Sequence, residues 1–253
     1  MEQFALTDRV VVVTGASRGI GKAIALGMAE AGADVVPMAR TTADVEAVAD
    51  SCEDHGVEAL PVSVDVTDVD AVREGIDAAV EEFGGVDCVV NNAGVNPEGA
   101  LGTPEHVDDD SMEFVLDVNL KGAFRIARAA ADSLAERGGS VINVASVGGL
   151  VGLPRQHPYV ASKHGMVGMT KSMALDWAPE VRVNGLAPGY VATDLTEELT
   201  ENEKLRKSIE NRTPLSRFAE PEEIAGPAVF LASDAAAYVT GTTLAADGGW
   251  TAR

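Results

Sequence analysis

VVVVTGASRGIG, residues 10–21, is the stretch that decides the fold of this chain. Its first part, Val10–Thr14, is a continuous β-branched run, which is typical of a strand buried on both faces of a parallel sheet. The glycines that follow allow a tight turn and a close approach of backbone to a phosphate, and a helix beginning at Gly19 would direct free N–H groups toward it. The spacing G-x-x-x-G-x-G differs from the commoner G-x-G-x-x-G fingerprint. Its position at the first strand-to-helix junction nevertheless predicts a nucleotide-phosphate site.

Short apolar runs alternate with helix-prone stretches along the rest of the chain. The strands we expect are Val10–Thr14, Asp34–Ala39, Glu58–Val64, Val86–Asn91, Ser140–Ala145, Val181–Ala187 and Thr243–Ala246. The helical stretches we expect are Gly19–Ala31, Thr42–His55, Val69–Phe83, Asp109–Ala135 (one helix or two), Tyr159–Trp177, Thr193–Asn211 and Pro221–Leu231. This alternation predicts an α/β fold, a single doubly wound Rossmann-type domain over residues 1–253 with a parallel sheet and helices on both faces. Functional residues should then follow the carboxyl ends of the strands.

The charge balance is strongly acidic, with 40 Asp and Glu against 19 Lys and Arg and a net charge of −21. Such a surface should repel nucleic acid and anionic membranes. The chain also contains no run of 18 apolar residues, so we expect no membrane span. The N-terminal residues leave no room for a signal peptide. Cys52 and Cys88 are interpreted as free thiols, so we expect a cytoplasmic protein without a metal site. An acidic, lysine-poor surface indicates a halophile enzyme, and a merely acidic protein is the alternative.

Tyr159 and Lys163 stand four residues apart in a predicted helix, which places them on one face. A fixed positive charge beside a phenol favours the phenolate and should lower the pKa of Tyr159 from its usual value of about 10. A tyrosine shifted in this way can serve as a general acid or base. Ser146, upstream of the pair, could hydrogen-bond to the oxygen being transformed. Taken alone, the Tyr–Lys spacing occurs by chance on many solvated helices.

The glycine-rich turn, the sequence NNAG at residues 91–94, and Ser146, Tyr159 and Lys163 together resemble the short-chain dehydrogenase/reductase family. The resemblance covers essentially the whole chain and ends in DGGW at residues 247–250. It implies a nicotinamide cofactor, chemistry without a metal, and usually a homotetramer. Within the family, the chain most resembles the group that contains gluconate and sugar dehydrogenases and 3-oxoacyl thioester reductases.

The resemblance also implies a role for each catalytic position. Tyr159 would give a proton to a carbonyl oxygen or remove it from an alcohol, and Ser146 would orient that oxygen. Lys163 would lower the pKa of Tyr159 and hold the nicotinamide ribose. Asn119 would fix a water that links Lys163 to solvent.

The cofactor contacts that the resemblance implies follow the strands. They are Gly15, Ser17, Arg18, Gly19, Ile20, Gly21, Arg40, Asp65, Val66, Asn91, Ala93, Gly94, Tyr159, Lys163, Pro188, Gly189, Val191 and Thr193. After the second predicted strand stands Arg40 and no acid, and Arg18 offers a second guanidinium. Since arginine matches phosphate geometry, this favours the 2′-phosphate of NADP, with NAD as the alternative. Asp44 lies in the following helix and is discounted.

The segments 95–106, 147–158 and 190–213 should hold substrate specificity, and the last suits a lid. The candidate substrate contacts are Asn96, Ser146, His157, Tyr159 and Tyr190, although His157 is more readily interpreted as a bystander. We favour the interconversion of a secondary alcohol and a ketone on a small sugar, sugar acid or hydroxy acid.

Two alternatives remain open at this point. A 3-oxoacyl-carrier-protein or 3-oxoacyl-CoA reductase is one, because Arg125 and Arg128 could dock an acidic carrier, although the net charge would repel it. A catalytically inactive NADP-binding scaffold or sensor is the other, and the complete set of four catalytic positions argues against it.

Overall fold

The computed structural model describes residues 2–252 and contains one seven-stranded parallel sheet in the order β3-β2-β1-β4-β5-β6-β7. The strands are β1 (Val10–Thr14), β2 (Asp34–Ala39), β3 (Val62–Ser63), β4 (Cys88–Asn91), β5 (Ser140–Val144), β6 (Arg182–Pro188) and β7 (Thr243–Ala246). The strand order reverses between β1 and β4. In an open α/β sheet, the crevice beyond the carboxyl ends at such a switch point is where ligands bind.

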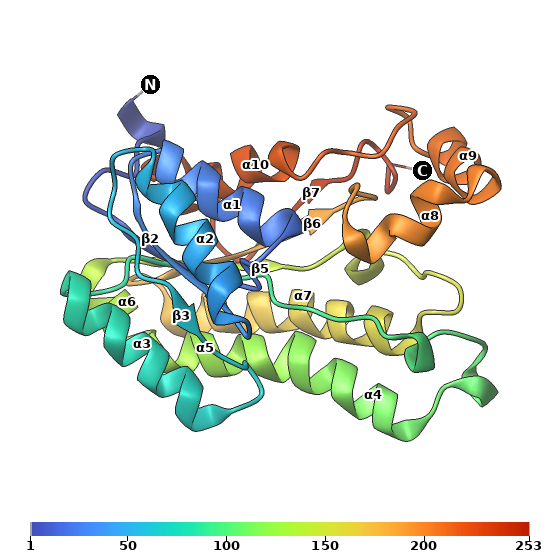
Figure 1. Cartoon of the computed structure of the whole chain (residues 1–253), viewed down its shortest axis with the longest axis horizontal. Coiled ribbons are helices and arrows are strands. Elements are labelled where there is room, and N and C mark those ends of the chain that lie inside the picture. Colours follow the sequence, from blue (N-terminus) through green and yellow to red (C-terminus); the bar gives the residue numbers. More distant parts are fainter. Residues whose placement is uncertain (1, 253) are drawn as a thin grey trace.

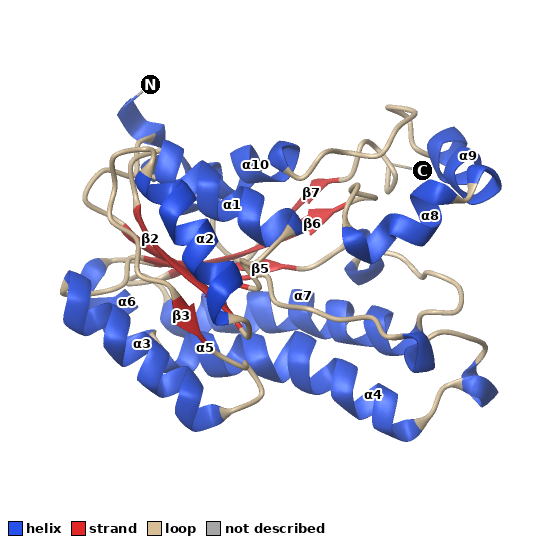
Figure 2. Cartoon of the chain, viewed as in Figure 1, coloured by secondary structure: helices blue, strands red, loops and turns tan. Residues whose placement is uncertain are grey.

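Helices cover both faces of the sheet, as the sequence predicts (Figure 1 and Figure 2). One face carries α1 (Gly19–Glu30), α2 (Thr42–Glu53) and α10 (Glu222–Ala232). The other carries α3 (Val69–Phe83), α4 (Asp109–Leu116), α5 (Ala123–Ala129), α6 (Ala131–Arg137) and α7 (His157–Trp177). The doubly wound α/β architecture is therefore confirmed.

Strand β1 explains why its sequence is apolar without alternation. Val11 and Val13 pack into the core beneath α1 and α10, whereas Val10 and Val12 pack into the core on the α3 and α5 side. All four side chains are buried, because each successive residue of a strand points to the opposite face and both faces are covered.

The third strand is shorter than predicted, since β3 covers only Val62–Ser63 of the expected Glu58–Val64, and the second strand contains a proline. Pro37 lies inside β2, opposite Val13 of β1. The N–H of Val35 points away from β1 and donates to the carbonyl of Glu58. The backbone N position of Pro37, two residues further on, points in the same direction, because the backbone of a strand repeats every two residues. There β3 pairs only with Met38 and Ala39, so the missing proline N–H interrupts no ladder bond.

The expected helical stretch Asp109–Ala135 is divided into pieces. A π-helical segment, Asp117–Gly122, separates α4 from α5, and α6 begins at Ala131. The acidic segment after β6 forms α8 (Glu197–Glu201) and α9 (Glu203–Arg212), which lie beyond the carboxyl end of β6 (Figure 1). Within residues 2–252, no helix combines the length and apolarity needed to cross a bilayer.

Candidate active site

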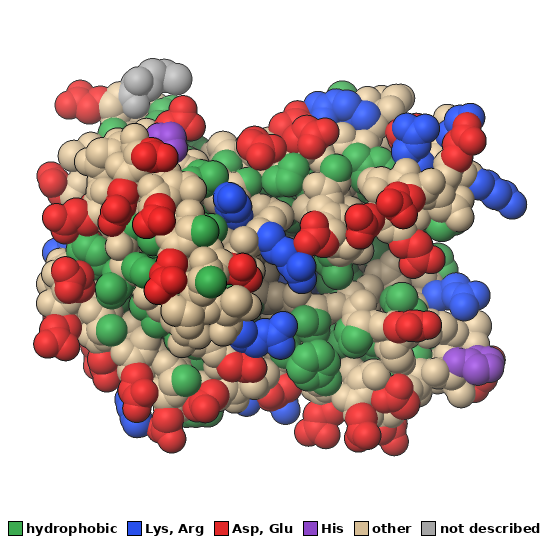
Figure 3. Space-filling view, viewed as in Figure 1, with side chains coloured by type: hydrophobic (Ala, Val, Ile, Leu, Met, Phe, Trp, Pro, Cys, Tyr) green, Lys and Arg blue, Asp and Glu red, His purple; other side chains and the backbone are tan. Residues whose placement is uncertain are grey.

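One cleft of about 550 Å³ lies at the carboxyl ends of the central strands. It brings together most of the residues predicted from the sequence, namely Gly15, Ser17, Arg18, Gly19, Ile20, Gly21, Arg40, Asp65, Val66, Ala93, Gly94, Ser146, Tyr159, Lys163, Pro188, Gly189, Val191 and Thr193. Figure 3 shows this face hollowed between the parts that carry α2 and α8, with Lys and Arg side chains along the hollow and acidic side chains over much of the remaining surface.

The glycine-rich turn has no room for side chains at its key positions. Gly15 and Gly19 have φ of +64° and +54°, a left-handed conformation that favours glycine. A Cβ on Gly15 would lie 2.8 Å from the Cα of Ala93, and a Cβ on Gly21 would overlap the carbonyl of Gly15 and the amide of Asn92. The turn therefore leads closely packed backbone into the N-terminus of α1, a geometry that fits the pyrophosphate of a dinucleotide.

Asn92 anchors this turn to the end of β4, and it is a residue that sequence reasoning did not select. Its Nδ2 donates to the carbonyls of Thr14 (3.0 Å) and Gly15 (3.2 Å), while the Thr14 hydroxyl accepts from the backbone N–H groups of Asn92 and Ala93. The predicted neighbour, Asn91, lies beneath the cleft wall, where it is buried and donates to Oδ1 of Asn143. The Asn-Asn pair was the available signal, but only the direction of the strand shows which asparagine faces the turn.

The adenosine end of the cleft holds both signs of charge. Arg40 lies on its wall and is exposed, in agreement with the prediction, but Asp44 lines the same wall although it was discounted. The first turn of α2 brings Asp44 there, since α2 begins directly at the end of β2. Arg18 forms an ion pair of 2.9 Å with Asp194, which stands at the start of the segment leading into α8.

Tyr159, Lys163 and Ser146 meet in the cleft, but the pKa of Tyr159 is shifted in the direction opposite to the prediction. Burial raises the pKa of Tyr159, opposed by a hydrogen bond with Ser146, whereas a value lowered by Lys163 was predicted. Nζ of Lys163 lies 5.7 Å from the centroid of the phenol ring and donates to the carbonyl of Val144 at 2.8 Å. Burial also lowers the pKa of Lys163 to about 8. Desolvation disfavours both charged forms here, so the phenol is held protonated at neutral pH.

Asn119 lies in the π-helical segment and is fully buried. Its carboxamide forms a closed pair with Val95, accepting from the N–H (2.8 Å) and donating to the carbonyl (3.0 Å), and it also donates to the hydroxyl of Ser162. Its side chain therefore fixes the chain that leaves β4 against the helix that carries Tyr159 and Lys163. A π-helical turn at such a place is a frequent feature of functional sites.

The remaining substrate candidates, Asn96, His157 and Tyr190, are not among the residues that line the cleft. Asn96 donates to Gln156 at 3.1 Å, which joins two of the predicted specificity loops, and Gln156 was not foreseen. His157 is exposed at the start of α7 and does not line the cleft. Tyr190 packs against Phe218 and Trp250, at ring distances of 5.9 and 4.8 Å.

This cleft combines a cradle for a dinucleotide with a protonated phenol beside a hydroxyl and an ammonium. Those features define a class, the nicotinamide-dependent oxidoreductases that interconvert a secondary alcohol and a ketone. A family model described as enoyl-(acyl carrier protein) reductase matches residues 15–251. The chain belongs to the short-chain dehydrogenase/reductase family.

Individual relatives span nearly the full chain. The 2-dehydro-3-deoxy-D-gluconate 5-dehydrogenase of Escherichia coli (strain K12) is 40% identical and covers 100% of this chain and 99% of its own. The 3-oxoacyl-(acyl-carrier-protein) reductase FabG of Staphylococcus epidermidis is 39% identical over 96% of this chain and 98% of its own. The crystal structure of a gluconate 5-dehydrogenase from Burkholderia cenocepacia J2315 in complex with NADP and tartrate has a TM-score of 0.95, with 36% identity over 100% of this chain and 98% of that one.

Proposed function

We propose that this protein, acting as one domain over its whole length, uses NADP(H) to interconvert the alcohol and ketone forms of a small hydroxy acid or sugar acid. The observation that carries the proposal is the meeting of Tyr159, Ser146 and Lys163 in the same cleft as the glycine-rich turn. The bound nicotinamide would supply or accept the hydride. The protein would place the substrate carbon beside it and move the proton.

The proton chemistry follows from the side chains. In reduction, Tyr159 donates its phenolic proton to the carbonyl oxygen, and burial, which raises its pKa, leaves it in the protonated form that this step requires. Ser146 holds the same oxygen by a hydrogen bond. Lys163 remains largely protonated at neutral pH with a pKa of about 8, so it stabilises the phenolate that forms. Asn119 acts as a positioning residue, through Val95 and Ser162.

NADP rather than NAD is proposed because two guanidinium groups, those of Arg18 and Arg40, lie on the wall of the cleft. The 2′-phosphate of NADP would find charge-assisted hydrogen bonds there. The neighbour from Burkholderia cenocepacia was crystallised with NADP. Asp44 on the same wall works in the opposite direction, since an acid near the ribose favours the free 2′-hydroxyl of NAD.

A small polar acid is favoured over a carrier-bound thioester for a reason internal to the chain. Of the two arginines considered for docking an acidic carrier, Arg125 is half-buried and paired with Asp117 at 2.8 Å. Arg128 packs over the ring of Phe124. Only Arg128 is therefore exposed for docking. Reduction of a 3-oxoacyl thioester remains the second candidate, because the Staphylococcus epidermidis reductase is almost as similar as the 2-dehydro-3-deoxy-D-gluconate 5-dehydrogenase of Escherichia coli.

The proposal includes the setting in which the enzyme works. We propose a cytoplasmic homotetramer adapted to high salt, in which the acidic surface keeps its hydration and its self-repulsion is screened. Phe124 on α5 and Tyr238 before β7 are exposed aromatic side chains that such an assembly would cover. Light scattering in dilute buffer and in molar KCl tests this. An unchanged mass, with full activity and stability in dilute buffer, would contradict it.

A spectrophotometric screen tests the main proposal. In molar KCl, NADP is offered with gluconate and other sugar acids, sugars and polyols, and NADPH with 3-oxoacyl thioesters and small ketones. We expect turnover with a hydroxy acid, and a higher kcat/KM for NADP than for NAD. Preferred reduction of the thioesters would replace the first candidate by the second, and NADPH binding without any turnover would indicate a scaffold.

A further inference from the structure

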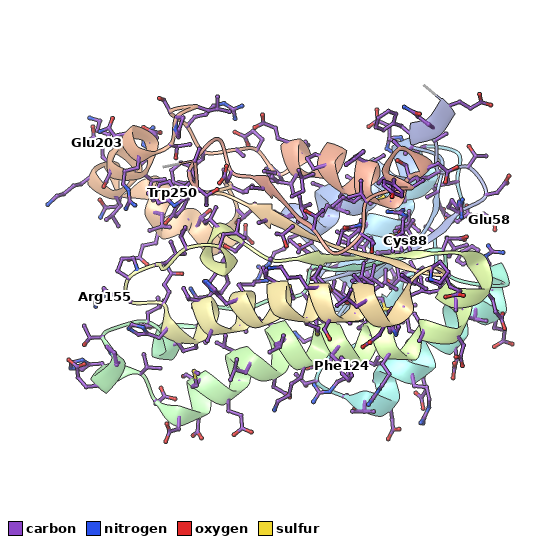
Figure 4. All side chains as sticks on the ribbon, turned by 180° about the vertical axis from the view of Figure 1, so that it is seen from behind. Glu58, Cys88, Phe124, Arg155, Glu203 and Trp250 are labelled. Atoms are coloured by element: carbon purple, nitrogen blue, oxygen red, sulfur yellow. The ribbon has the colours of Figure 1, made fainter. Side chains whose placement is uncertain are left out.

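An aromatic wall lies next to the cleft, packed against the residue that follows Ser146. It is formed by Tyr190, Phe218 and Trp250, which pack together with that residue, Val147. The wall comes from three distant parts of the sequence and lies against α9. In Figure 4, Trp250, Glu203 of α9 and Arg155 lie at one end of the molecule, opposite Cys88 and Glu58.

Arg212 is the cation of this wall. It ends α9 and is exposed, and its guanidinium carbon lies 4.4 Å from the centroid of the Trp250 ring. Two other basic side chains of α9 are paired, Arg206 with Glu210 and Lys207 with Glu203. Among residues 2–252, Arg212 has no acidic partner within ion-pair distance, although the chain contains 40 acidic residues.

Tyr190 connects Arg212 to the reacting centre. Burial raises the pKa of Tyr190, and the nearby charge of Arg212 acts against this. Tyr190 in turn influences the pKa of Tyr159. In the chain, Tyr190 stands between Gly189 and Val191, which line the cleft, and its ring packs against Trp250, the residue on which Arg212 lies. A substrate with its alcohol carbon at Tyr159 and its far end directed toward this wall would bring that end toward Arg212.

We propose that Arg212 binds the carboxylate of the substrate and is the residue that selects hydroxy acids over neutral sugars. A guanidinium presents paired N–H donors that match a carboxylate. On a protein of net charge −21, an anionic substrate is repelled at long range, so its selection requires a local cation. This inference rests on the proposed function, because it names the group that recognises the acid end of that substrate.

The test compares two substrates with the same carbon chain, gluconate and the neutral polyol sorbitol. In Arg212→Gln we expect KM for gluconate to rise roughly 10- to 100-fold, as for the loss of a hydrogen bond to a charged group. Kinetics with sorbitol and the Kd for NADP should be unchanged. Arg212→Lys, which keeps the charge, should recover part of the loss. Arg206→Gln, on the same helix but paired with Glu210, is the matched control and should change neither substrate.

The outcomes separate the two proposals. An equal loss with gluconate and sorbitol, or no loss with either, overturns the role of Arg212 and leaves the proposed function intact. If the wild-type enzyme oxidises neither compound but reduces 3-oxoacyl thioesters, the hydroxy-acid function fails and this inference fails with it.

Discussion

The two halves of the cleft are built in different ways. The cofactor half is made of strand ends and backbone, with Gly15, Gly21 and Asn92 in contacts so close that no side chain could be added. The substrate half is made of side chains from separated loops, such as Asn96 with Gln156 and Arg212 with Trp250. The first half is specified by local sequence and shared geometry, whereas the second depends on which distant residues the fold brings together.

The largest effect should come from the residue at the boundary of the two halves. Tyr159→Phe removes only the phenolic hydroxyl, so the proton donor is lost while the wall of the cleft keeps its shape. We expect kcat to fall roughly 10²- to 10⁴-fold, the usual contribution of general acid–base catalysis. The Kd for NADPH, measured by its fluorescence, should change less than about twofold, because the aromatic ring keeps its place in the wall of the cleft. Turnover within tenfold of wild type would refute the assignment of Tyr159.

The second prediction tests whether the cofactor half is as tightly packed as its geometry indicates. In Gly21→Ala, the new methyl group would overlap the carbonyl of Gly15 and the amide of Asn92, so the turn must open. We expect a loss of about 1–3 kcal/mol in the free energy of unfolding, as for overpacking, and at least tenfold weaker binding of NADPH. Thermal unfolding and fluorescence titration measure the two effects.

Gly168→Ala is the matched control for this change. Gly168 lies in α7, and a Cβ there would meet no atom within 4 Å. Alanine in a helix interior should stabilise the protein by roughly 0.5–1 kcal/mol and leave NADPH binding unchanged. If the two variants lost cofactor affinity equally, the close packing at Gly21 would not be the cause.

The contrast between the halves also explains what the sequence could predict. Most of the strands, the glycine turn and the positions of Ser146, Tyr159 and Lys163 follow from local patterns, and the structure places the turn and these three residues in one cleft. The direction of the pKa shift of Tyr159 could not be predicted. The sequence shows the spacing of Tyr159 and Lys163, but it does not show that both groups are buried.

Tertiary proximity accounts for the remaining differences. Asp44 reaches the cleft wall because α2 begins immediately after β2, and Gln156 reaches Asn96 across 60 positions of sequence. Arg212 meets Trp250 only because the C-terminal segment returns beneath α9. No periodicity or motif in the chain records such meetings, and the substrate half consists largely of them.

The smallest predicted effect concerns an ion pair that joins the two halves. Arg18 of the glycine turn and Asp194 before α8 are both exposed, and their charged groups lie 2.9 Å apart. If Arg18 also binds the 2′-phosphate of NADP, Asp194 competes for the same guanidinium. Removing that competition in Asp194→Asn should tighten NADP binding, whereas NAD, which lacks the phosphate, should bind as before.

Because exposed ion pairs are weak, the expected decrease in the Kd for NADP is only about two- to fivefold. Asp70→Asn breaks a comparable exposed pair, with Arg73 on α3, and serves as the control that should leave both dinucleotides unaffected. In an Arg18→Ala background the Asp194→Asn change should have no effect on NADP. Equal changes for NADP and NAD, or weaker NADP binding in Asp194→Asn, would mean that the pair clamps the cleft for any dinucleotide. The lid segment would then belong to the cofactor half of the site, and the division between the two halves would have to be drawn beyond α9.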